Sequence, residues 1–231
     1  MEIGNELHRD GRRGGSRLRR VGAGMTPNAL YIESDDGPLP AQLARHVEAG
    51  RLRVVRQVDL TPSDFNAACG LITTAYLDQI DFDARRSTIA TFLEKGGRIV
   101  FNGHVVRPFI DGMRPFVPLA TQRRSDLAIE RLTSHPIFAG ISAQAHAAQK
   151  GVAGFYGRGH NPPLAGATFL TGIGPNRLPV DWEWLLPGGG GLFVHSGNDI
   201  WAVSDDAGVN ELVAERVVAW SLAGRSERAA A

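Results

Sequence analysis

The stretch EKGGRIVFNGH, from Glu94 to His104, has the pattern of a helix end, a glycine stop, a buried strand and a sharp exit. Paired glycines end helices because glycine readily takes the left-handed backbone of a helix cap. The run IVF is apolar on both faces, as in strands of a covered parallel sheet. In open α/β sheets, ligands bind at the carboxyl ends of such strands. The stretch therefore places Asn102, Gly103 and His104 where a site is expected.

Alternating strand and helix patterns surround this stretch. Short apolar or β-branched runs predict strands over residues 28–34, 51–58, 69–76 and 98–104, and helical spacing predicts helices over 38–50, 61–68 and 81–97. Later strands are expected at 167–174 and 191–199. A C-terminal helix over 208–224 is expected to turn inward a stripe comprising Leu212, Val213, Arg216, Val217 and Trp220. This order predicts an α/β fold in which a mainly parallel central sheet lies between two helical layers.

Length and charge limit the domain organisation and the partners. A chain of 231 residues that is 43% hydrophobic is suited to one α/β domain, which we place at residues 25–226. The formal net charge of +1 indicates neither nucleic acid nor a membrane surface as a partner. Because the sequence has no secretory or transmembrane pattern, we expect a cytoplasmic protein. A homo-oligomer stays open.

The two ends of the chain differ from this domain. Residues 1–24 carry six arginines and few apolar side chains, which predicts a disordered basic tail, and residues 227–231 are expected to be disordered as well. The alternatives for the basic segment are an arm that binds RNA or DNA and a true start at Met25, directly before the first strand.

Three blocks of the sequence together resemble a known superfamily. They are GLITTAYLDQIDFDARRSTIATFLEKGGRIVFNGH (residues 70–104), HPIFAGI (135–141) and GGGGLFVHSGND (188–199). Over residues 29–224 the chain resembles the class I glutamine amidotransferase-like superfamily, including its ThuA-like relatives. The resemblance implies a flavodoxin-like three-layer sandwich in which the exit of the fourth strand is a nucleophile elbow.

The elbow of this chain departs from the family pattern. Amidotransferases place a cysteine there in a G-x-C-x-G turn, because a thiolate activated by a neighbouring base attacks the amide. This chain has Phe101, Asn102, Gly103 and His104 at that point. Its single cysteine, Cys69, opens the preceding strand, where a small buried hydrophobe is the favoured interpretation. We therefore expect no glutaminase activity.

Imidazole and carboxylate groups are the remaining candidates for chemistry. The family layout implies that His104, His160 and His195 converge on one cleft, with Asp199 beside His195. Histidine suits both proton transfer and metal binding, but the spacing matches no short metal motif. We therefore predict no metal site, leave any cofactor unspecified, and keep independent structural roles for the three histidines as the alternative. The predicted catalytic residues are His104, His195 and Asp199, and the predicted ligand-binding residues are Asn102, Gly103, Glu33, Arg158 and His160.

A second motif alternates carboxylates with indoles. In LPVDWEWL, Asp181 and Glu183 fall on one face of a strand and Trp182 and Trp184 on the other. Sugar binding on aromatic platforms is one interpretation, and it fits the ThuA-like connection with carbohydrates. A solvent-facing strand with its tryptophans in the core is the favoured alternative.

Two functions follow from these patterns. The first is a degenerate amidotransferase-like domain that binds a small polar ligand or a protein partner and catalyses nothing. The second is a ThuA-like hydrolase, or a related enzyme, that acts on a sugar or small metabolite through histidines at the carboxyl edge of the sheet. The missing nucleophile favours the first.

Overall fold

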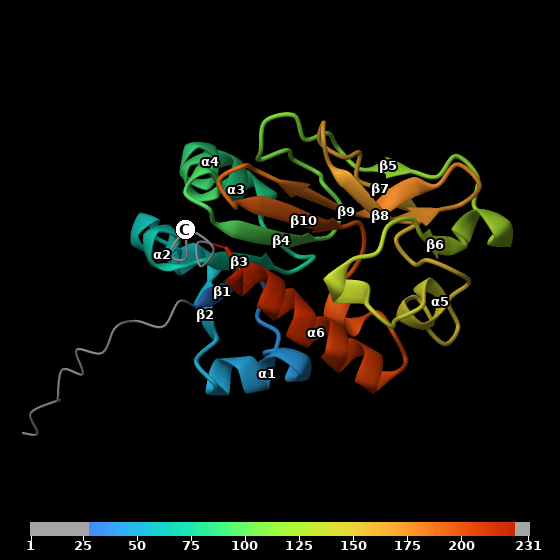
Figure 1. The fold of residues 1–231 in the computed structure, drawn as a ribbon, viewed down its shortest axis with the longest axis horizontal. Coiled ribbons are helices and arrows are strands. Elements are labelled where there is room, and N and C mark those ends of the chain that lie inside the picture. Colours follow the sequence, from blue (N-terminus) through green and yellow to red (C-terminus); the bar gives the residue numbers. More distant parts are fainter. Residues whose placement is uncertain (1–27, 225–231) are drawn as a thin grey trace, which may run out of the picture.

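The computed structural model describes residues 28–224, and its centre is an eight-stranded sheet (Figure 1). The strand order is β2-β1-β3-β4-β10-β9-β8-β6. The first five strands of this order are parallel, and the last three continue the sheet with antiparallel pairing. Their bounds are Ala29–Glu33 (β1), Leu52–Arg56 (β2), Gly70–Thr73 (β3), Arg98–Asn102 (β4), Ile129–Arg131 (β6), Thr168–Ile173 (β8), Leu178–Leu185 (β9) and Gly191–His195 (β10).

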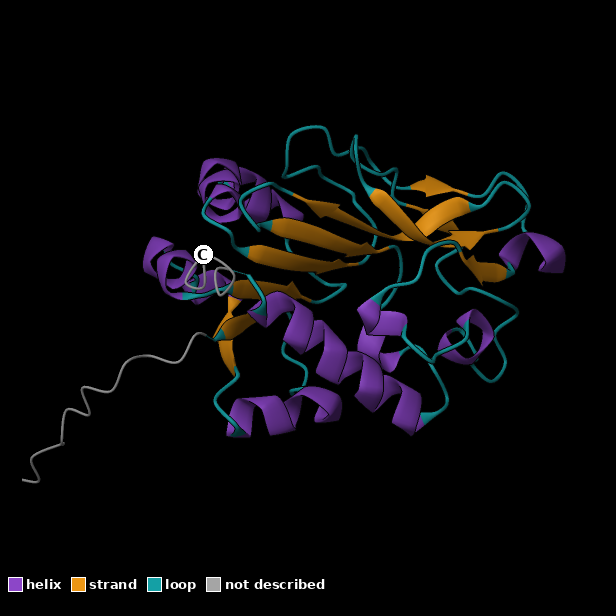
Figure 2. Cartoon of the chain, in the orientation of Figure 1, coloured by secondary structure: helices purple, strands orange, loops and turns teal. Residues whose placement is uncertain are grey.

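Helices cover both faces of this sheet (Figure 2). One face carries α1 (Ala41–Glu48) and α6 (Ala207–Leu222), and the other carries α2 (Pro62–Ala67), α3 (Gln79–Ala84) and α4 (Arg86–Glu94). Each interface has its own apolar core. Val213 and Val217 of α6 pack in one, and Phe65 and Phe92 of α2 and α4 pack in the other. The predicted α/β fold with helices on both sides of a mostly parallel sheet is confirmed.

The local sequence explains where the helices before β4 begin and end. Thr61 and Asp64 form a capping box at the start of α2, where the Thr61 backbone N–H donates to Oδ2 of Asp64 at 2.9 Å. After α4, Gly96 has a φ of +88°, the left-handed conformation that the glycine pair predicted. Gly97 lies against the ring of Phe92, which leaves no room for a Cβ atom.

The segment between β4 and β8 holds only short elements. β5 (Val117–Pro118) pairs with β7 (Gly159–His160) in a two-stranded antiparallel sheet, and α5 (Ala143–His146) follows β6. Four 3₁₀ turns complete the described part of the chain: Gln57–Asp59 (η1), Arg124–Leu127 (η2), Pro136–Phe138 (η3) and Ile200–Ala202 (η4).

Two expectations about side-chain orientation are wrong. Leu212, predicted to lie in the inner stripe of α6, is 40% exposed, because the buried face of the helix is centred on Val213 and Val217. β9 was expected to turn its carboxylates to solvent, but Asp181 is 1% exposed. The reason is that both faces of β9 are covered: Asp181 packs against His195 and Arg131 on one face, and Trp182 lies in the apolar core on the other.

The predicted tails at residues 1–24 and 227–231 lie outside the described residues, as does Met25. Within residues 28–224, the helices are too short or too polar for any of them to span a membrane.

Candidate functional site

The exit of β4 turns sharply at Gly103. Its φ of +108° lies in a region that other residues rarely adopt, and a Cβ atom there would lie 3.2 Å from both Cα and the carbonyl oxygen of Ala75. The Gly103 N–H donates to the carbonyl of His195 at 3.1 Å, which holds the turn against the end of β10. The geometry of a tight strand exit is thus present without a nucleophile.

Asn102 is buried and ties three segments together. Its Nδ2 donates to the carbonyl of Thr73 at 2.7 Å, and its Oδ1 accepts from the N–H of Ile200 at 3.1 Å. These bonds join the ends of β3 and β4 to η4. The structure therefore gives the Asn102 amide a role inside the protein, and its predicted contact with a ligand stays a prediction.

A pocket of about 530 Å³ opens beside this turn, at the carboxyl edge of the sheet. Polar groups come from Asp78, Gln79, His104, Arg107 and Asn198, and Gly103 and Gly197 also line it. Its edge is apolar. The side chains of Tyr76, Ile80 and Val106 are 72%, 67% and 77% exposed. We call this the strand-edge pocket.

Among the predicted site residues, His104 and Gly103 line the strand-edge pocket. The His104 imidazole stacks on Phe116 with ring centroids 3.5 Å apart. Burial lowers the pKa of His104, and a hydrogen bond to the backbone of Gly157 opposes that shift only in part. Neutral imidazole, which both donates and accepts, is therefore the form that a ligand meets at neutral pH.

His195 lies beneath the pocket, fully buried, in a polar cluster. Its Nδ1 is 2.5 Å from Oδ1 of Asp181, and a short hydrogen bond joins its Nε2 to the hydroxyl of Tyr156. The hydroxyl of Tyr156 also bonds to the backbone of Asn198, which lines the pocket. A carboxylate, an imidazole and a phenol are thus aligned, with the phenol nearest the pocket.

Arg131 and His146 complete the buried cluster. Nη1 of Arg131 is 3.6 Å from Oδ2 of Asp181, and its guanidinium lies 3.6 Å from the ring centre of Phe138. Burial lowers the pKa of His146 to about 3, so its ring is neutral. Burial alone would raise the pKa of Asp181, but the interaction with His195 and the charge of Arg131 outweigh it and hold the pKa below its ordinary value. Asp181 is therefore a stable buried anion.

Asp199 has the opposite electrostatic setting. Burial raises its pKa to about 6, and the charge of Asp35 acts in the same direction. The N–H of Ala75 donates to its Oδ1 at 2.7 Å, which stabilises the ionised form in part. Ala75 and Asn198 both line the strand-edge pocket, so a carboxyl group that titrates near neutral pH lies at its border.

The other predicted ligand-binding residues lie apart from this pocket. His160 is on β7, paired with Val117, and burial lowers its pKa. Arg158 precedes it with a φ of +55°, and its carbonyl accepts from the N–H of Leu119. Glu33, at the end of β1, lines a neighbouring pocket of about 450 Å³ with Asp35, Asp36 and Arg56, and Asp78 borders both pockets.

The three histidines do not share one cleft. Only His104 lines the strand-edge pocket, whereas His195 is covered and His160 is not part of its wall. Residues 28–224 also contain no group of three or more histidine, cysteine or acidic side chains placed to hold a metal ion.

The aromatic residues of β9 are not exposed as platforms. Trp182 is fully buried and its Nε1 donates to the carbonyl of Asn161 at 3.0 Å. Glu183 is bonded to Nε1 of Trp220 at 2.6 Å and lies 3.3 Å from Nε2 of His135. Trp184 is half-buried against the same core, so the strand presents no fully exposed indole, which counts against the sugar-platform interpretation.

Cys69 is buried at the amino end of β3, where its Sγ donates to the carbonyl of Asn28 at 3.1 Å. It thus lies at the end of the strand away from the strand-edge pocket.

The buried cluster around His195 contains residues that sequence reasoning missed. The sequence shows Asp181 only as one of two alternating carboxylates in a strand, and it predicts no site role for Tyr156 or Arg131. The available signal was the pairing of two late strands, which brings Asp181 opposite His195. No known protein-family model and no curated protein matches the chain.

Proposed function

We propose that the chain is an amidotransferase-like domain of the flavodoxin-like type that has no glutaminase activity and binds a small polar ligand at the strand-edge pocket. The parallel strand order β2-β1-β3-β4-β10 supports the fold assignment, because it is the order of flavodoxin-like sheets. The fourth strand in the chain then ends where the family has its elbow.

The observation that carries the proposal is the combination of Gly103 and His104 at the wall of one pocket. Gly103 makes the turn, and His104 stands where a nucleophile is otherwise mounted. With a volume of about 530 Å³, the pocket falls in the ordinary range for small-molecule sites. The Gln79 amide and the Asp78 carboxylate are bonded to backbone groups. The groups that suit a ligand which both donates and accepts hydrogen bonds are therefore the His104 imidazole, the Asn198 amide and the Nη groups of Arg107.

A protein partner is the alternative occupant. The exposed side chains of Tyr76, Ile80 and Val106 around the pocket favour it, because large apolar side chains that gather at a surface mark interaction sites. A partner would insert a polar side chain into the pocket and cover this apolar edge.

Two measurements test the proposal. Ammonia release from glutamine should equal the uncatalysed rate for the parent and for Cys69→Ala, because the buried thiol is remote from the pocket. Thermal melts against sugars, nucleotides and amino acids should show stabilisation by at least one class; saturation at 100 times Kd adds about 2.7 kcal/mol. Glutaminase activity that disappears in Cys69→Ala would overturn the first part, and melts unmoved by every class would count against the second.

An enzyme is the second candidate, and the aligned Asp181, His195 and Tyr156 side chains favour it. In a serine protease triad, the imidazole takes the proton of a hydroxyl while a buried carboxylate stabilises the resulting cation. Here the hydroxyl is phenolic, and burial raises the pKa of Tyr156 well above its ordinary value. Tyr156 is thus protonated and suited to donate its proton to a substrate. The phenolate left behind takes a proton from Nε2 of His195 when that ring is an imidazolium, the cation that Asp181 stabilises, and His195 then regains a proton from solvent.

The structure places this hydroxyl close to the pocket wall. A Cβ atom added to Gly197, which lines the pocket, would lie 2.6 Å from the Tyr156 hydroxyl oxygen. Tyr156→Phe should therefore abolish any turnover that a substrate screen finds while leaving ligand affinity within about threefold. Tyr76→Phe, at an exposed tyrosine of the same pocket, is the matched control. Full turnover by Tyr156→Phe would rule out the proton relay.

A further inference from the structure

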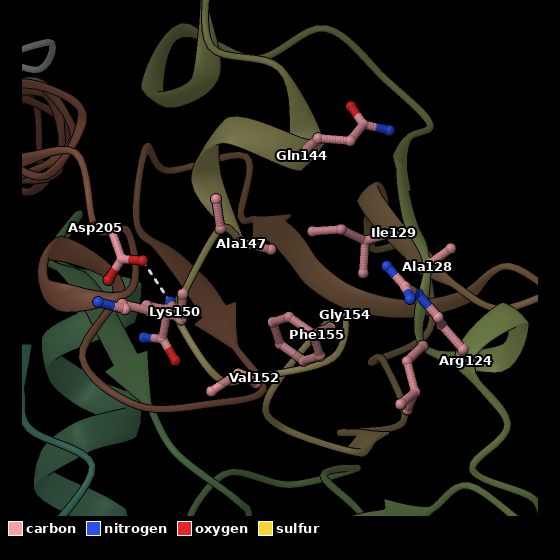
Figure 3. A pocket seen from close by; sticks show the side chains of 13 residues that line it. Arg124, Ala128, Ile129, Gln144, Ala147, Lys150, Val152, Gly154, Phe155 and Asp205 are labelled. Atoms are coloured by element: carbon pink, nitrogen blue, oxygen red, sulfur yellow. Dashed lines mark hydrogen bonds between the residues drawn. The ribbon is translucent and has the colours of Figure 1, made fainter.

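We infer that a second pocket, which shares no lining residue with the strand-edge pocket, binds a medium-chain carboxylate. It has a volume of about 460 Å³ and lies between η2, β6, α5 and the loop over residues 148–155 (Figure 3). The inference does not depend on the function proposed above. We call this the η2–α5 pocket.

The floor of the η2–α5 pocket is apolar. Leu127, Ile129 and Phe155 are buried at its base, and Ala147 and Val152 extend the apolar wall. Gly154, with a φ of +66°, holds the loop so close to Leu127 that a Cβ atom would lie 2.5 Å from its carbonyl oxygen. The loop therefore packs tightly against η2 and forms one wall of the pocket. Such a floor favours an aliphatic or aromatic body.

Charge is distributed unevenly around the mouth. Arg124 lies on one side and Lys150 and Asp205 lie on the other, across Phe155 (Figure 3). Asp205, the only carboxylate in the lining, accepts a hydrogen bond from the backbone N–H of Lys150. Arg124 forms no ion pair or side-chain hydrogen bond with any residue in the described part of the chain. Because Lys150 lies beside Asp205, the net positive charge of the mouth is at the Arg124 side.

These two features specify the class of ligand. A guanidinium binds a carboxylate with two parallel hydrogen bonds, and the apolar floor takes the chain attached to it. At the far side the charges of Lys150 and Asp205 offset each other, so a second carboxylate would gain no net attraction there, which favours a monocarboxylate over a dicarboxylate. A monocarboxylate with an apolar body, oriented with its head toward Arg124, therefore fits best.

Octanoate is a suitable probe, with butyrate and octanol as matched controls. Butyrate keeps the charge and lacks most of the body, and octanol keeps the body and lacks the charge. In protein labelled at isoleucine methyl groups, octanoate should shift the resonance of Ile129 in the η2–α5 pocket and leave Ile80 of the strand-edge pocket unchanged. Both controls should bind at least about tenfold more weakly, because each lacks one of the two interactions.

Arg124→Gln should weaken octanoate binding by about tenfold, as expected when a charge-assisted hydrogen bond is lost. Arg123→Gln is the matched control, because it removes the same charge one residue away from the lining and should bind octanoate as the parent does. Ala147→Phe, which fills the pocket, should abolish the Ile129 shift. Octanoate that shifts Ile80 instead, or that binds Arg124→Gln and Arg123→Gln equally well, would overturn the inference, as would no binding at all.

Discussion

Nδ1 of His195 lies 2.5 Å from Oδ1 of Asp181, and both side chains are almost completely excluded from solvent. The two residues are direct cross-strand partners on β10 and β9. Arg131 approaches the same carboxylate from β6, so side chains from three strands of the sheet meet at one buried anion. The late antiparallel strands thereby stabilise the end of β10, next to the strand-edge pocket.

Asp181→Asn should destabilise the fold by about 1–3 kcal/mol, because it leaves the partly buried Arg131 without its counter-ion and removes the charge-assisted hydrogen bond to His195. Urea denaturation at pH 7 measures the loss. Asp36→Asn, at an exposed carboxylate, is the control and should change the free energy of unfolding by less than about 0.5 kcal/mol.

The same carboxylate gives a pH dependence with a defined sign. The pKa of Asp181 is lower in the folded protein than its ordinary value, so its contribution is present above the unfolded pKa and is lost as pH falls through the folded pKa. The difference in unfolding free energy between parent and Asp181→Asn should therefore shrink in acid. A difference that stayed constant down to the acid transition would contradict the buried anion.

Asp199→Asn should act in the opposite direction. Because burial raises the pKa of Asp199 to about 6, the ionised carboxylate destabilises the folded state at pH values above that pKa. The variant should be more stable than the parent by about 1–3 kcal/mol at pH 7.5, since one pKa unit corresponds to about 1.4 kcal/mol. The gain should fall as pH decreases through 6 toward the unfolded pKa. Equal stability of the two proteins at pH 7.5 would show that Asp199 is solvated.

Gly103→Val should lower stability by about 1–3 kcal/mol, because valine resists a φ of +108° and its Cβ would crowd Ala75. Thermal melts provide the measurement. The control is Gly140→Asn: its φ of +73° is one that asparagine tolerates, and no atom lies within 4 Å of an added Cβ. If both variants melted like the parent, the turn after β4 would not need glycine.

Periodicity predicted much of the first half of the fold. The strands up to β4 and the helices between them follow from short apolar runs, helical spacing and the glycines after α4. The location of the candidate site at Gly103 and His104 also follows from the parallel strands, because ligands bind at the carboxyl ends of parallel strands.

The buried cluster could not be predicted in the same way. Asp181 and His195 are separated by 14 residues and Tyr156 and His195 by 39, so their contact depends on how β9 and β10 pair and on where the loop before β7 lies. Alternation in β9 indicated a strand with two different faces, but only the side chains that pack on each face decide that both Asp181 and Trp182 are buried. His195, predicted to reach a ligand, is covered, and its bond to Tyr156, which lies against Gly197, connects it with the pocket wall.

The most direct test of the account is whether His104 takes part in binding at the strand-edge pocket. Sugars, nucleotides and amino acids are added in turn to isoleucine-labelled parent protein and to His104→Ala. The methyl resonance of Ile80 is followed, and that of Ile129 in the η2–α5 pocket is the control. The account predicts that at least one class shifts Ile80 and not Ile129, that His104→Ala weakens this binding by about tenfold, and that both proteins unfold at closely similar urea concentrations. If no class moves Ile80, or if His104→Ala binds as tightly as the parent, the site lies elsewhere.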